Sequence, residues 1–196
     1  MKIFKKIFFI IIFSSLINPC FAKDPSEFIS EVTQTASNIL KEDITLDEKA
    51  EKLIILAESS VDIDGIGLYS LGKHRKAINK EELNKYKIIF RKYFLKSFSS
   101  RLSQYSDPKI NVVSHNTINE KYTIVSSILV ETSERPEIKI DWRVYTINPT
   151  KPLIRDLIIE GLSLARTQKE EFNSVIQGAD GDVNALFTNL ENFTLK

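Results

Sequence analysis

Two short stretches of the chain hold residue types that serve in catalysis or in metal binding. In the first, Ser114 and His115 follow Asp107 closely, and serine, histidine and aspartate are the members of a nucleophilic triad. A triad also needs an oxyanion hole, and the chain has no G-x-S-x-G motif that would place a nucleophile on a sharp turn. We therefore interpret His115 as an exposed loop histidine.

The second stretch, Asp180-Gly181-Asp182-Val183-Asn184 with Glu191 further on, matches ligand positions 1, 3, 5 and 12 of an EF-hand loop. Position 6, where the loop needs glycine, is Ala185. The apolar residues that follow form one face of a helix, and a helix cannot also wrap a calcium ion. We expect a helix N-terminus capped by aspartate here, and no metal site.

A basic cluster, Lys73-His74-Arg75-Lys76, follows Gly72. One interpretation is solvated charge at a helix C-terminus, where positive side chains interact favourably with the helix dipole. The other is a docking surface for a partner or for lipid headgroups. The whole chain has 27 Lys and Arg against 26 Asp and Glu, which argues against a general nucleic-acid binder.

The periodicity of apolar residues predicts an α+β protein. Helical spacing covers 24–40, 46–60, 62–71 and a long aromatic helix over 81–105. The period then changes to two, which predicts a curved four-stranded antiparallel sheet covered by helices. The predicted strands are 109–113, 122–130, 138–145 and 153–159, with a polar turn region at 116–120 and final helices at 163–176 and 182–193.

Residues 1–22 have the layout of a secretory signal peptide: early lysines, an apolar run and small residues before Lys23. The run is about eleven residues, short of the ~20 that span a bilayer. An uncleaved anchor, or a lipoprotein lipidated at Cys20, are the alternatives. Because Cys20 is the only cysteine, an intrachain disulfide is excluded. We expect residues 23–196 to form one exported domain.

The segment from Arg155 to Leu164 resembles the hallmark of the MlaC family, also called the toluene-tolerance family. That hallmark is an aspartate in a strand, then Glu-Gly-x-Ser opening a helix, then a phenylalanine. The matching residues here are Asp156, Glu160, Gly161, Ser163 and Phe172, and a second match surrounds Gly72. Pro152 stands where the family usually has tryptophan, which suggests a divergent member.

The resemblance implies a divergent NTF2-like fold with an internal apolar pocket that holds the tails of a phospholipid. It implies a periplasmic shuttle with no catalytic residue, metal or cofactor, whose only bound molecule is its lipid cargo. The implied partners are an outer-membrane lipoprotein complex and an inner-membrane lipid ABC transporter with substrate-binding ring domains. Such a shuttle maintains the lipid asymmetry of the outer membrane.

Apolar residues on the predicted strands and helices are the candidate walls of this pocket. They are Val125, Ile128, Val130, Ile138, Ile140, Trp142, Val144, Leu157 and Ile159 from strands, and Leu68, Leu71, Phe90, Phe94 and Phe98 from helices. The inward face of 122–130 stays open, because both of its faces are apolar. Gly161 is expected to allow a sharp strand-to-helix turn, and Ser163 to cap the helix, with a headgroup contact as the second interpretation.

Other functions remain compatible with the sequence. An aromatic stripe such as that of 81–105 is equally the pattern of a filled core. An NTF2-like enzyme or small-ligand sensor would use the same cavity with an acid inside it, and Asp141 or Asp156 would be that acid. An exported adhesion or structural protein is a third reading.

Overall fold

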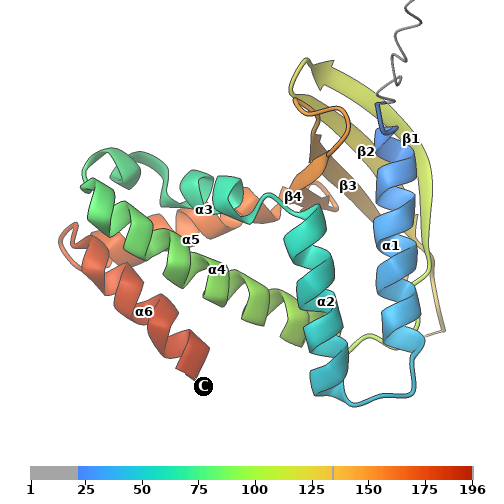
Figure 1. Ribbon diagram of the computed structural model, residues 1–196, viewed down its shortest axis with the longest axis horizontal. Helices are drawn as coiled ribbons and strands as arrows, with labels where there is room; N and C mark the ends of the chain where they lie inside the picture. The colour runs from blue at the N-terminus through green and yellow to red at the C-terminus, as the bar shows by residue number, and fades with distance from the viewer. Residues whose placement is uncertain (1–21, 134, 196) are drawn as a thin grey trace, which may run out of the picture.

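The computed structural model describes residues 22–133 and 135–195. Along this part of the chain, four α-helices come first, the strands of an antiparallel sheet follow, and two α-helices come last (Figure 1). The helices are α1 (Pro25–Lys41), α2 (Leu46–Ser60), α3 (Ile63–Leu71), a 3₁₀ turn η1 (Gly72–Lys76), α4 (Lys80–Leu102), α5 (Leu164–Gly178) and α6 (Val183–Leu195). The strands are β1 (Ile110–Asn119), β2 (Tyr122–Leu129), β3 (Ile138–Tyr145), β4 (Leu153–Ile159) and β5 (Leu162–Ser163). The predicted α+β class is therefore confirmed.

Local sequence signals fix where the helices begin. Asp24 accepts hydrogen bonds from the first backbone amides of α1. A capping box starts α2, in which Thr45 and Glu48 satisfy each other's backbone amides, and Asn79 with Glu82 does the same for α4. Each such box pairs N–H groups that have no partner within the helix.

The sheet is an antiparallel meander in the order β1-β2-β3-β4-β5. Along β2 the buried residues are Thr123, Val125, Ser127 and Leu129, so this is its inward face. Val125 lies opposite Trp142 of β3, and Trp142 Nε1 donates to Ser127 Oγ at 2.8 Å. The inward face of 122–130, open from the sequence, is thereby assigned.

The prediction of four strands is wrong, because the sheet formed by the described residues has five. β1 continues through the expected turn region to Asn119, which pairs with Tyr122. β1 is an edge strand that is exposed along most of its length. It therefore has runs of polar residues, whereas a half-buried strand would alternate apolar and polar residues. β5 is only two residues long and pairs with Ile158 and Ile159 of β4, too short to give a sequence pattern.

The helices divide into those beside the sheet and those away from it (Figure 1). α1 lies along β1 and β2, and α2 lies beside α1. The long aromatic helix α4 packs on α2, α3 and α6, whereas the sequence led us to expect it against the sheet. None of the described helices is both long and apolar enough to cross a membrane.

Candidate functional site

Three consecutive residues of β4, Ile154 to Asp156, fasten the two segments by which the chain enters the outer helices, which we define as α3 to α6. The backbone N–H of Asp62 donates to the Ile154 carbonyl at 2.9 Å, and Arg155 Nε donates to Asp62 Oδ2 at 2.5 Å. Asp62 also caps α3 by accepting from the Gly65 amide. The start of α3 is thus bound to β4 by backbone and side chain together.

Arg155 is held in turn by two aromatic residues of the outward sheet face. It donates to the Tyr122 hydroxyl at 2.7 Å, and its guanidinium lies 3.9 Å from the ring centre of Tyr145. Burial acts to lower the pKa of Arg155, but its hydrogen bonds to Asp62 and Tyr122 outweigh that and raise it. The guanidinium therefore stays charged and serves as a fixed clamp.

The next residue, Asp156, fastens the start of α5. It is 4% exposed, accepts from the Ala165 backbone N–H at 3.0 Å and from Ser163 Oγ at 2.6 Å. Ser163 Oγ accepts from the Arg166 amide, so the expected helix cap is present. The carboxylate and the hydroxyl together satisfy the otherwise unpaired amides of the first turn.

Glu160 and Gly161 form the link between these groups, with φ of 48° and 82°. Two successive left-handed residues make a type I′ hairpin turn, so the expected strand-to-helix turn is instead a hairpin joining β4 to β5. Glu160 Oε1 also accepts from the Lys139 backbone N–H at 2.5 Å. The Asp156 to Ser163 segment is a structural joint throughout.

Apolar side chains gather in three buried clusters. The sheet cluster contains Phe28, Ile29, Val125, Leu129, Ile140, Trp142, Val144 and Ile154. The helical cluster contains Ile63, Ile66, Leu71, Tyr86, Ile89, Phe90, Phe172, Ile176, Leu186, Phe187 and Leu190. The corner cluster contains Ile39, Leu40 and Leu53, where α1, α2 and α4 meet.

Half-buried apolar side chains join these clusters, and we call Val32, Ala36, Val61, Phe94 and Phe98 the seam. Val32 and Ala36 lead along α1 from the sheet cluster to the corner cluster. Phe94 and Phe98, stacked with centroids 5.9 Å apart, lead along α4 from the corner to the helical cluster. Val61 touches both remaining clusters. The seam is therefore a set of apolar side chains that pack on the three clusters and stay partly open to solvent.

The candidate pocket residues divide among these clusters instead of surrounding one space. In the sheet cluster or packed against it are Val125, Ile138, Ile140, Trp142, Val144 and Leu157. Leu71, Phe90 and Phe94 belong to the helical cluster or pack on it, and Phe98 packs on the corner cluster. Of the predicted walls, Phe94 and Phe98 line the seam.

The other candidates lie elsewhere. Ile128 faces outward from β2, since its inward neighbours are Ser127 and Leu129, and Val130 follows the end of that strand. Ile159 pairs with Ile140 at the end of β4, and Leu68 is half-buried on α3. Two open hollows, of about 390 and 370 Å³, lie away from the seam: one lies between α4 and α6, the other at Arg101, Gln104 and Tyr105.

The two acids considered for catalysis lie on the outward face of the sheet. Asp141 accepts from Ser126 Oγ at 2.6 Å, and Asp156 lies opposite Arg143 in the register. Asp141 lies between the inward residues Ile140 and Trp142 of β3, so its side chain is on the other face. Asp156 pairs with Arg143, which lies between the inward residues Trp142 and Val144. Neither carboxylate therefore faces the seam. Each already has hydrogen-bond partners that account for its position.

Two tyrosines bring hydroxyl groups into the helical cluster. The Tyr86 hydroxyl donates to the Gly67 carbonyl at 2.8 Å, and that of Tyr93 donates to Gln168 Oε1 at 3.1 Å. Burial raises the pKa of both hydroxyls, and for Tyr93 the bond to Gln168 opposes the rise. Both therefore act as neutral structural donors.

The residues considered for a triad have other partners in the structure. His115 lies on β1, not in a loop, and its Nδ1 is 2.7 Å from Ser26 Oγ at the start of α1. Asp107 pairs with Lys41 at 2.8 Å. Sequence reasoning missed the contact between Ser26 and His115, because 89 positions separate them and neither belongs to a motif. It links α1 to the edge of the sheet.

The two charged motifs also have structural roles. Asp182 accepts from the Asn184 amide at 2.9 Å before α6, as a capping aspartate does. Within residues 22–133 and 135–195, no three His, Cys, Asp or Glu residues are grouped to hold a metal ion. In the basic cluster, His74 is buried and its Nε2 lies 3.0 Å from Asn173 Oδ1, while Lys73 stays exposed.

Comparison with known families settles the relationship that the hallmark suggested. The family model described as MlaC protein matches residues 30–192. The chain belongs to the MlaC family. In this MlaC-family chain the hallmark Phe172 is a core residue, packed edge-on against Phe90 with centroids 6.1 Å apart. The hallmark thus contributes a joint and a core contact.

A solved structure shows the same fold. It is a phospholipid-binding protein from Ralstonia solanacearum in complex with a phospholipid, and its TM-score to this MlaC-family chain is 0.73. The two share 17% sequence identity, over 88% of this chain and 98% of that one. No curated protein matches the chain in sequence.

Proposed function

We propose that this MlaC-family protein binds a phospholipid with the acyl tails in the seam and carries it across the periplasm. The observation that carries the proposal is the seam itself: apolar side chains from α1 and α4 that join three clusters and stay half-buried. The apolar surface that these side chains still expose would be removed from water when an apolar ligand covers it, which is favourable. The phospholipid complex of the Ralstonia protein, with its similar fold, supports the same ligand class.

The energetics of lipid transfer explain why a carrier is needed. Two acyl chains have roughly 30 methylenes, and exposing each to water costs about 0.8 kcal/mol, so the total is roughly 24 kcal/mol. A free phospholipid therefore does not cross an aqueous compartment at a useful rate. A protein that covers the tails and leaves the headgroup in water removes most of this barrier.

Binding without catalysis is the function that the polar groups favour. An enzyme on this fold needs an acid or base inside the apolar space, and Asp141 and Asp156 both lie on the opposite face of the sheet. The tyrosines of the helical cluster are committed to internal hydrogen bonds. The lipid is then cargo, with no cofactor.

The finer proposal concerns the route. The protein takes lipid from an outer-membrane lipoprotein complex and delivers it to an inner-membrane ABC transporter with substrate-binding ring domains, so preserving outer-membrane lipid asymmetry. Its support is the family membership and the signal-peptide pattern of residues 1–22, which lies outside the described residues except for Ala22.

Lipid extraction tests the ligand. The protein purified from its exported form without detergent, then denatured and extracted, should release about one phospholipid per chain in mass spectrometry. Preparations that release none, and that take up none from labelled phospholipid vesicles, would refute lipid binding.

Placing a charge in the seam tests the site. Val32→Glu and Phe98→Glu put a carboxylate among the tails from two different helices, and we expect each to lower bound lipid at least tenfold. Val113→Glu, at a residue 61% exposed on β1, is the matched control and should keep its lipid. Circular dichroism must show all three folded; seam variants that are folded and still loaded would place the ligand elsewhere.

A further inference from the structure

α4 and α6 run side by side in the same direction and leave a groove between them. Tyr86 stacks on Phe187 near one end, with centroids 5.7 Å apart, and Tyr93 meets Phe193 at 5.0 Å further along. Other residues of the same two helices line the hollow of about 390 Å³. Its volume suits a few side chains of a partner.

Three of the residues that line the groove are aliphatic, and two of these are open to solvent. The two are Ile88, which is 60% exposed in the middle of α4, and Leu195, which is 83% exposed. Ile89 lies beside them and is buried. Adjacent exposed aliphatic residues around a concave surface are typical of an interaction site.

Positive charge borders the same groove. Lys85 and Lys92 line it from α4, about two turns apart, and α4 has no acidic residue after its first turn. Among the described residues neither lysine has a carboxylate within ion-pair distance, whereas Arg91 pairs with Asp64. Lys85 lies 5.9 Å above the ring of Phe187. The excess charge is therefore available to a partner.

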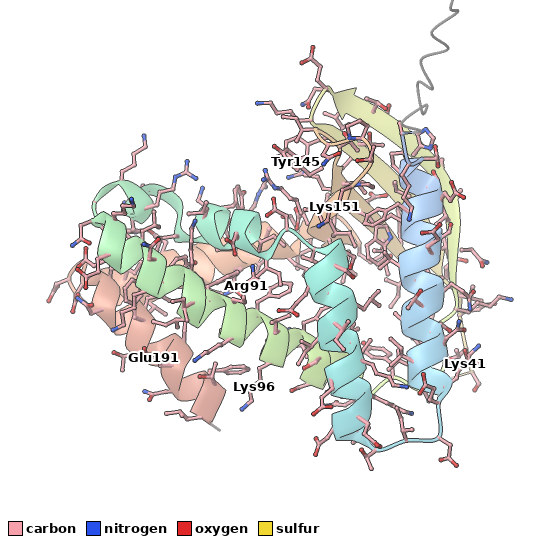
Figure 2. All side chains as sticks on the ribbon, viewed as in Figure 1. Lys41, Arg91, Lys96, Tyr145, Lys151 and Glu191 are labelled. Atoms are coloured by element: carbon pink, nitrogen blue, oxygen red, sulfur yellow. The ribbon has the colours of Figure 1, made fainter. Side chains whose placement is uncertain are left out.

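One acidic residue, Glu191, lies on the α6 side of the groove (Figure 2). Lys96 of α4 is also labelled on this part of the molecule, and its Nζ donates to the Thr194 carbonyl at 3.1 Å. The charge is thus asymmetric: the α4 wall is basic, and the α6 wall has one carboxylate and one hydroxyl. An occupant would be oriented with its acidic side toward α4.

We propose that the α4–α6 groove docks a segment of a partner protein that presents an aliphatic side chain flanked by acidic ones. The aliphatic group fits the hollow beside Ile88 and Leu195, and the acidic groups reach Lys85 and Lys92. A bilayer surface is flat and would leave the hollow unfilled, whereas a projecting side chain fills it. This site is separate from the seam, so it goes beyond lipid binding and does not depend on it.

The test uses the exported chain and a synthetic helical peptide with leucines on one face and glutamates flanking them. In an NMR titration we expect saturable amide shifts confined to α4 and α6, weakened by added salt. The double variant Lys85→Glu with Lys92→Glu should weaken binding at least tenfold. The control, Lys121→Glu with Lys151→Glu, makes the same change of charge at exposed lysines in the connections between strands, of which Lys151 is labelled in Figure 2, and should keep the affinity within twofold.

Four results would overturn the proposal. The first is no saturable binding up to about 1 mM peptide, and the second is an equal loss of affinity in the two double variants. The third is binding to phosphatidylcholine–phosphatidylglycerol vesicles, in place of the peptide, that depends on Lys85 and Lys92. The fourth is a dimer of this chain that the changes at Lys85 and Lys92 dissociate. An Ile88→Ser variant provides a second readout, with at least a threefold loss expected. Bound phospholipid measured on the same samples should not change, which separates a failure of docking from a failure of lipid binding.

Discussion

Replacing Asp156 by alanine should destabilise the protein far more than an outward-facing aspartate usually does. Asp156 accepts from the Ala165 N–H at 3.0 Å and from Ser163 Oγ at 2.6 Å, and its side chain is 2% exposed. Hydrogen bonds to a charged group contribute about 1.5–3 kcal/mol each, and the orphaned amide adds its own penalty. The 3.7 Å contact with the half-exposed Arg143 adds little. We expect the free energy of unfolding to fall by about 3–5 kcal/mol.

Urea denaturation followed by circular dichroism measures this loss, and thermal melting should show a fall of roughly 6–20 °C. Asp141→Ala is the matched control, because Asp141 lies on the same face, accepts from Ser126 and is more exposed. It should cost about 1 kcal/mol. Asp156→Asn keeps an acceptor for the Ala165 amide and should cost about 1–2 kcal/mol.

Two outcomes would refute the assignment of this hallmark residue to a joint. The first is an Asp156→Ala variant no less stable than Asp141→Ala. The second is an Asp156→Asn variant that is folded and stable but retains no lipid, which would show that the carboxylate meets the ligand.

Three further substitutions test other parts of the structure. Gly161→Ala should cost about 1–2 kcal/mol in urea denaturation, because φ is 82° and no atom lies within 4 Å of the added methyl; an unchanged midpoint would contradict the turn assignment. Tyr86→Phe removes the buried hydrogen bond to the Gly67 carbonyl and should cost about 1 kcal/mol, whereas a neutral effect would show that this bond adds nothing to stability. The capping bonds from Thr45 lower the pKa of Glu48 below its ordinary value of 4.5. The ionised Glu48 side chain therefore stabilises the protein above pH 4.5, and this stabilisation is lost as the pH falls through the lowered pKa. Glu48→Gln should reduce the dependence of unfolding free energy on acid pH, and an unchanged dependence would count against the capping box of Thr45 and Glu48.

The sequence predicted the elements with strong periodicity and missed those whose form depends on distant partners. Val125, Trp142 and Val144 alternate with polar residues, so the central strands were clear. The polar run around Asn116 resembled a turn, because an edge strand exposed to water needs no alternation. The short β5 exists because Asp156 holds Ser163, a contact that no local pattern reveals.

The residues that line a lipid site stay a prediction, but the sequence did indicate much of the apolar interior. Most of the apolar residues chosen belong to the buried clusters or pack on them, and the spacing of Phe90, Phe94 and Phe98 correctly indicated one face of a helix. That spacing cannot tell which element the face meets, and here it meets helices. The role of α1 beside the sheet was not expected, because Val32 and Ala36 belong to an ordinary amphipathic pattern.

The attachments at β4 have a mechanical consequence. Ile154, Arg155 and Asp156 hold both the start of α3 and the start of α5, so the two places where the chain passes into the outer helices α3 to α6 are tied along one short line. Farther from that line, α3 to α6 are held to the rest of the protein by side-chain contacts, such as those of Phe98 with the corner cluster and of Arg91 with Glu58 of α2 at 3.8 Å, and by the chain itself where α4 leads into β1. A small turn of these helices about β4 would therefore widen the seam while the hydrogen bonds of Ile154, Arg155 and Asp156 stay intact.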